Sequence, residues 1–95
     1  MNITDLLTKN DDVFTKALET FGHSKQASMC MGECGELIAE LNRYYGQGRG
    51  DTTEVVDEIA DVVIMTHQMS LLFGVERVKV RVAEKIEKLK RKFNA

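Results

Sequence analysis

Residues 51–73 read DTTEVVDEIADVVIMTHQMSLLF, and this stretch decides the fold. Its apolar residues occupy almost the whole circumference of a helix, a pattern typical of a helix that is buried on more than one side. Asp51 and Glu54 form a capping-box-like start, which predicts the N-terminus of that helix. Glu58 and Asp61 interrupt the apolar surface. Because an unpaired buried carboxylate is very costly, both acids are expected to be protonated, paired or bound to a cation.

A second acidic pair, Glu33 and Glu36, lies in the preceding helical stretch, which we expect to cover residues 24–45. Residues three apart share one helix face, with Cβ atoms about 5–6 Å apart, so each pair points two carboxylates in one direction. The period assigns a neighbouring stripe to the core: Ala27, Cys30, Cys34, Leu37, Ile38 and Leu41. The glycine-rich run 46–50 predicts a turn, with Gly46 in the left-handed position that commonly closes a helix. The two helices then fold back on each other, and the four carboxylates converge.

Four carboxylates in one small volume indicate a bound cation. Like charges at short range disfavour ionisation unless a cation neutralises them. A site made only of oxygen ligands suits Mg²⁺, which binds through carboxylates and substrate phosphates, and Mn²⁺ can substitute for it. Structural ion pairing is the alternative, and two matched acidic pairs on adjacent helices favour metal binding over it.

The remaining segments also have helical patterns. We expect a short first turn at residues 3–7, a helix from residue 11 or 12 to 21, Ser24 as the N-cap of the next helix, and a last helix over residues 75–93. The chain has no proline and favours helix throughout. It therefore predicts a single all-α domain over residues 1–95, an antiparallel bundle of about four helices.

The size of the chain predicts association with another copy. A chain of 95 residues can bury only a limited core. The helix at 51–73 carries more apolar surface than three small neighbours need, so part of it is expected to face another subunit. Oligomerisation would then complete the bundle.

Charge and hydropathy restrict the function classes. The formal net charge of −2 argues against a binder of nucleic-acid polymers. Bases crowd the last helix, so it could grip phosphate beside the acidic site, although a solvated basic face is the simpler interpretation from charge alone. The N-terminus lacks a basic stretch followed by an apolar run, and no apolar run approaches the roughly 20 residues of a membrane span. A cytoplasmic protein without membrane contact is expected.

The motifs resemble those of the MazG-like nucleoside triphosphate pyrophosphohydrolases, an all-α superfamily. The matching run extends from Gln26 to Phe93. It contains Glu33-Cys34-Gly35-Glu36, then Asp57-Glu58-Ile59-Ala60-Asp61-Val62, and then a last helix with Glu84-Lys85-Ile86, Lys88 and Arg91. The family signature is an E-x-x-E helix, a connection and an E-x-x-D helix. Either half is common by chance, whereas both together, followed by a Lys/Arg-rich helix, are fairly specific.

The resemblance implies Mg²⁺-dependent hydrolysis of a nucleoside triphosphate between its α and β phosphates, which yields a monophosphate and pyrophosphate. Carried over by position, the catalytic and metal-binding residues would be Glu33, Glu36, Glu58 and Asp61. The substrate-binding residues would be Gln26, near the nucleotide, and Lys85 with Lys88 or Arg91, at the phosphates. The proton of the attacking water would go to Glu36 or Glu33. Family members form homodimers, sometimes dimers of dimers, so a homodimer or homotetramer is implied.

Three departures from the family pattern leave base recognition open. Many relatives have a glutamate at the position of Gly32, many have an asparagine at that of Leu89, and others place a tryptophan near the base, whereas this chain has no tryptophan. The substrate could be a ribonucleotide or a deoxynucleotide. The enzymatic alternative is a phosphoribosyl-ATP pyrophosphohydrolase, which shares the architecture. The alternative from a different class is a non-catalytic helical interaction module that keeps its acidic pairs for structure.

Overall fold

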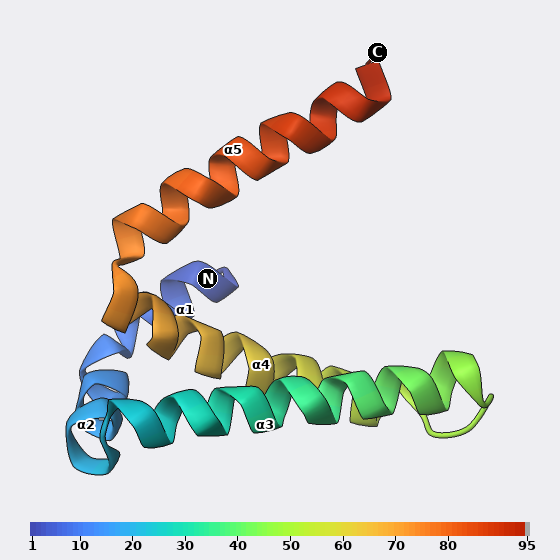
Figure 1. Cartoon of the computed structure of the whole chain (residues 1–95), viewed down its shortest axis with the longest axis horizontal. Helices are drawn as coiled ribbons and strands as arrows, with labels where there is room; N and C mark the ends of the chain where they lie inside the picture. Colours follow the sequence, from blue (N-terminus) through green and yellow to red (C-terminus); the bar gives the residue numbers. More distant parts are fainter. Residues whose placement is uncertain (95) are drawn as a thin grey trace.

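The computed structural model describes residues 1–94 and is all-α in that range (Figure 1). Its elements, in order, are α1 (Ile3–Lys9), α2 (Asp11–Phe21), α3 (His23–Leu41), the π-helical turn η1 (Asn42–Gly46), α4 (Thr52–Phe73) and α5 (Val75–Asn94). The all-α prediction is confirmed. The expected first turn at residues 3–7 is a longer helix, α1, and the other helices begin and end within a few residues of their predicted bounds.

Two helix boundaries follow from local chemistry that the sequence shows. The Asp51 side chain accepts a hydrogen bond of 3.0 Å from the backbone N–H of Glu54, so it caps α4 as predicted. Gly74 then ends α4 with a φ of 115°, a conformation that a residue with a Cβ rarely adopts.

Two other boundary predictions are wrong. Helix α3 begins at His23, directly after Gly22, so Ser24 lies inside the helix and does not cap it. Gly46 does not take the left-handed position, because α3 continues into the π-helical turn η1 and the positive φ angles of the loop fall on Gly48 and Gly50.

The two longest central helices, α3 and α4, lie side by side and run in opposite directions (Figure 1). Helices α1 and α2 pack at the end of this pair where α3 begins. At Gly74 the chain bends by 116°, and α5 projects away from the pair as an arm with the C-terminus at its far end (Figure 1). A four-helix antiparallel bundle is therefore not formed within one chain.

The contact between α3 and α4 is polar, which reverses the expected arrangement of α3. Residues of the described chain that are almost fully buried are Leu18, Gln26, Glu40, Met65 and Gln68. The apolar stripe predicted to form the core of α3 is only half-buried at Ala27, Cys30, Cys34 and Leu37, and Ile38 is 68% exposed. That prediction is wrong for a single chain: the polar row of α3 faces α4, and the apolar row faces outward.

Two contacts of His67 hold helix α2 against α4, one polar and one aromatic. The Nε2 atom of His67 lies 2.6 Å from Oδ1 of Asp11, and the imidazole ring packs edge-on against Phe14. The sequence indicates a core or interface position for His67, but not its acidic partner 56 residues away. This contact fixes the N-terminal helices on the side of α4 near its C-terminus.

Within residues 1–94, none of the helices is long and apolar enough to cross a membrane alone. Helices α4 and α5 taken together meet that criterion by length and composition only, and the bend of 116° separates them.

Candidate metal centre

Facing side chains of α3 and α4 form a continuous row, here called the seam. It begins at Gln26 and Gln68, whose amides are hydrogen-bonded from Nε2 of Gln26 to Oε1 of Gln68 at 2.8 Å. Seven residues further along α3 lies Glu33, and seven residues back along α4 lies Asp61. In an antiparallel pair, equal numbers of residues forward on one helix and back on the other lead to another facing pair. These acids therefore face each other as the amides do. The next step of three brings Glu36 opposite Glu58.

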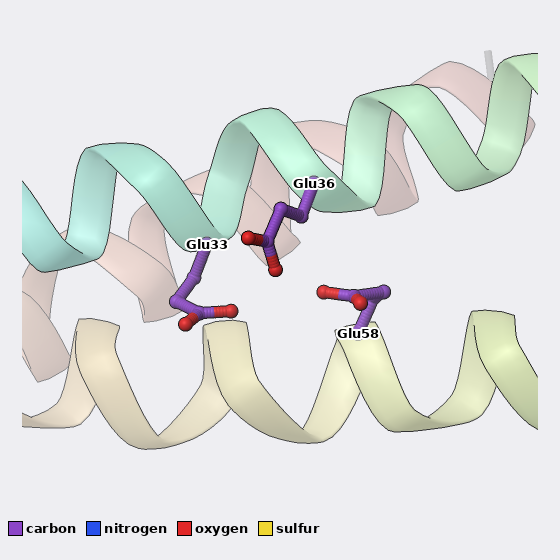
Figure 2. Close-up of side chains that lie close together, drawn as sticks. All are labelled: Glu33, Glu36 and Glu58. Atoms are coloured by element: carbon purple, nitrogen blue, oxygen red, sulfur yellow. The ribbon is translucent and has the colours of Figure 1, made fainter.

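Three of the acids meet closely. One carboxylate oxygen from each of Glu33, Glu36 and Glu58 lies within 4.8 Å of the others. Figure 2 shows Glu33 and Glu36 reaching from α3, and Glu58 from α4, into the space between the two helices. The predicted convergence of the two acidic pairs is therefore observed for these three residues.

The fourth acid, Asp61, belongs to the same group by its electrostatic effect. Burial raises the pKa of the Glu33 carboxyl above its ordinary value, and the carboxylates of Glu36 and Asp61 raise that pKa further. Burial likewise raises the pKa of Glu58, followed by the charges of Glu36, Asp61 and Glu33. Each of the four acids thus acts on at least one other, as expected for carboxylates held together without a counter-charge.

The donor set fits a hard divalent cation. The Oε2 atoms of Glu33 and Glu58 are buried and have no hydrogen-bond partner. Such buried, unpaired carboxylate oxygens are costly unless a proton or a cation meets them. The facing ligands are all oxygen, which suits Mg²⁺ or Mn²⁺ and not a metal that prefers nitrogen or sulfur. The two cysteines of α3, Cys30 and Cys34, are free.

The sequence-predicted substrate residues separate into two groups. Gln26 lies on the seam, two helical turns before Glu33, and is 6% exposed. Lys85, Lys88 and Arg91 lie together along one exposed depression of α5. Since α5 projects away from the pair of helices (Figure 1), the structure does not bring these bases to the carboxylates of the same chain.

Sequence reasoning missed two seam residues, Gln68 and Glu54. Gln68 stands in an otherwise apolar part of α4 and is 5% exposed, with Gln26 as its partner. The antiparallel register would have found it, because equal steps back from the Glu33–Asp61 pair lead to Gln26 on one helix and Gln68 on the other. Glu54 was assigned only to the helix cap, and the same register places it opposite Glu40.

Comparison with known proteins adds no further constraint. No family model matches the chain, no curated protein sequence matches it, and no solved structure matches it. The functional assignment rests on the seam and on the motifs that form it.

Proposed function

We propose that the protein is a Mg²⁺-dependent nucleoside triphosphate pyrophosphohydrolase of the MazG-like type. The observation that carries the proposal is the meeting of Glu33, Glu36 and Glu58 within 4.8 Å between two helices, with buried oxygens that lack partners. The all-α fold and the motif spacing support this proposal.

The carboxylates of the seam have distinct tasks in this reaction. When bound, Mg²⁺ supplies charge neutralisation at the phosphate oxygens. Glu33, Glu36, Glu58 and Asp61 would hold it between α3 and α4. A water attacks phosphorus at the α–β anhydride, the bridging P–O bond breaks, and nucleoside monophosphate and pyrophosphate leave. Glu33 or Glu36 accepts the proton of that water.

A second copy of the chain supplies the missing phosphate contacts. The acidic seam has no cation partner apart from Arg43, and the bases of α5 have no contact with it in one chain. The apolar row of α3 and that of α5 are both exposed, including Met31, Ile38, Val82 and Ile86. Exposed apolar surface of this extent marks an interaction site. A homodimer or homotetramer covers both rows and brings Lys85, Lys88 and Arg91 of one copy towards the seam of another.

The reaction is tested by a substrate panel. Canonical and modified nucleoside triphosphates, both ribose and deoxyribose, are incubated with the protein in Mg²⁺ or in EDTA, and pyrophosphate and monophosphate are measured. The account predicts equal amounts of both products in Mg²⁺ and none in EDTA. Release of orthophosphate and a nucleoside diphosphate would instead indicate cleavage at the β–γ bond and would overturn the assignment.

The sharing of the site between copies is tested by mixing two inactive variants. Asp61→Asn removes a seam carboxylate, and Lys85→Ala removes a base of α5. If the seam of one copy uses α5 of another, randomly mixed dimers regain about a quarter of the wild-type sites, because each mixed dimer contains one intact site. Mixtures that stay inactive after denaturation and refolding together would place both residues in one chain's site.

Two alternatives are separated by the same assays. Phosphoribosyl-ATP is included in the panel, and hydrolysis of that compound alone would identify a phosphoribosyl-ATP pyrophosphohydrolase. Only the exposed apolar rows favour the alternative, a non-catalytic interaction module. Such a module would form no product from any substrate, and its self-association would persist when the seam acids are neutralised.

A further inference from the structure

The seam continues beyond the four motif acids. Four residues after Glu36 on α3 lies Glu40, and four residues before Glu58 on α4 lies Glu54. These steps keep the antiparallel register of the seam, so Glu40 and Glu54 face each other one helical turn further out. Their Oε2 atoms both lie 3.7 Å from the point that a Cβ would occupy on Gly50. Both carboxylate oxygens therefore lie beside Gly50 at the loop end of the helix pair.

Glu40 brings an independent sign of a missing ligand. It is 7% exposed, which is unusual for a glutamate. Its Oε1 atom is paired with the guanidinium of Arg43 at 2.6 Å, but its Oε2 atom is buried and has no partner. That oxygen lies beside Gly50, and Arg43 does not pair with it. The position is therefore suited to a cation that the chain itself does not supply.

We propose that Glu40 and Glu54 bind a second divalent cation, Mg²⁺ or Mn²⁺, at an outer position of the seam. Two carboxylates and several retained waters are a usual coordination for Mg²⁺. Glu54 is exposed, so it leaves a path for a hydrated cation, and Gly50 places no side chain beside the two oxygens. The inner position is that of Glu33, Glu36, Glu58 and Asp61.

The two positions differ in charge, which predicts their order of filling. Four carboxylates surround the inner position, whereas two carboxylates and one arginine surround the outer position. The outer cation is therefore bound more weakly, since the number of charged ligands sets the affinity. Its place, about 6 Å along the seam from Glu36 at a rise of 1.5 Å per residue, is within reach of the distal phosphates of a nucleotide bound at the inner position. The proposal extends the metal centre of the proposed function, but it requires only cation binding and not hydrolysis.

The test is titration of the metal-free protein with Mn²⁺, followed by calorimetry and by electron paramagnetic resonance. The wild type is expected to bind in two steps, and the second ion should broaden the signal of the first through dipolar coupling. Glu54→Gln and Glu40→Gln should each weaken the second step at least roughly tenfold and leave the first within about threefold, as loss of one charged ligand implies. Arg43→Gln should tighten the second step, because it removes a positive charge from Glu40. Glu19→Gln is the matched control: it removes the charge of an exposed glutamate on α2.

Three results would contradict the outer cation position. A second step unchanged in Glu54→Gln and Glu40→Gln, with the fold intact by circular dichroism, would overturn the outer position. A single step that both variants weaken would also overturn it, because Glu40 and Glu54 would then belong to one site with the motif acids. A loss of affinity in Arg43→Gln would assign Glu40 to a structural ion pair with Arg43. Failure of the proposed function looks different: ions bind in two steps, but no nucleotide is hydrolysed.

Discussion

The seam and α5 place their charged residues in opposite ways. On the seam the carboxylates come from both helices and leave three buried oxygens without hydrogen-bond partners, Glu33 Oε2, Glu40 Oε2 and Glu58 Oε2. On α5 both signs are present, all are exposed, and two ion pairs, Arg81–Glu84 and Lys90–Glu87, form on the helix surface. Surface pairs of that kind contribute little to stability. Buried carboxylate oxygens without partners therefore mark the candidate centre, whereas the charges of α5 are exposed to solvent.

The same comparison bears on the proposed association of copies. The seam has acids that are not neutralised by a cation. Helix α5 has bases that contact no anion and an apolar row that no other helix buries. An amphipathic helix that packs on nothing does not account for its own apolar face. Each region has what the other lacks, although the bend at Gly74 keeps them apart in one chain. We infer that assembly of copies joins them.

The largest expected effect is on catalysis. Asp61→Asn keeps the shape of the side chain and removes one charge of the centre, so Mg²⁺-dependent turnover should fall by about 100-fold or more, as for the loss of one preorganised electrostatic group. Steady-state pyrophosphate release measures this. The matched variant Asp12→Asn, at an exposed position of α2, should retain activity. Equal activities would mean that the seam charge is not used in the reaction.

The next effect concerns assembly. Ile38 is 68% exposed on the outer apolar row of α3, so Ile38→Glu costs a single chain little and costs an interface a great deal. The variant should be a folded monomer by light scattering and circular dichroism under conditions in which the wild type is an oligomer. Thr15→Glu, at an exposed position of α2, should leave assembly unchanged. A wild type that is itself monomeric at micromolar concentration would contradict the shared site.

A smaller effect tests the amide end of the seam. Gln68→Leu leaves the buried Gln26 amide without its partner, which should lower the free energy of unfolding by about 1–3 kcal/mol. Urea unfolding measures the change. In the double variant Gln26→Leu/Gln68→Leu neither amide is left unpaired, so most of the loss should be recovered. Additive losses in the double variant would show that the amide pair does not fix the contact of α3 with α4.

The smallest effect is the pH dependence of the metal-free protein. The pKa of Glu58 is raised in the folded state by burial and by its acidic neighbours. The folded protein thus holds this proton more tightly than the unfolded chain, and stability is lost as the pH rises through the raised pKa. Glu58→Gln removes the repulsion, so in EDTA at neutral pH it should unfold at a higher temperature than the wild type.

That advantage should shrink as the pH falls towards the unfolded value of a glutamate, about 4.3. Saturating Mg²⁺ should reverse the order, because the wild type then gains the binding energy of the ion. Calorimetric scans over this pH range, with and without Mg²⁺, provide both comparisons. An advantage that persists at acid pH would indicate a packing effect and not relief of charge.

Local chemistry predicted the elements well and their packing less well. Asp51 caps α4 and the helices run near their expected ranges, because caps and helical periods act over a few residues. The meeting of Glu33, Glu36 and Glu58 was also anticipated, since E-x-x-E and E-x-x-D each fix a face and the short turn fixes the antiparallel order. Lys85, Lys88 and Arg91 were expected beside them, and the bend at Gly74 prevents this in one chain.

The orientation of α3 could not be derived from the sequence for a physical reason. Periodicity shows that the apolar stripe with Ile38 should be buried, but it does not say whether this chain or another copy buries it. The polar row with Gln26 and Glu40 faces α4 instead, which costs desolvation unless partners or ions meet those groups. An arrangement that depends on partners outside the chain leaves no local signal in its own sequence.

The most direct test of the central claim is a calorimetric titration of Mg²⁺ into the metal-free wild type and into Asp61→Asn. We expect saturable binding by the wild type, a marked loss of affinity in Asp61→Asn and an unchanged affinity in the control Asp12→Asn. The absence of saturable binding up to millimolar Mg²⁺, or equal binding by the wild type and Asp61→Asn, would contradict a metal centre formed by Glu33, Glu36, Glu58 and Asp61.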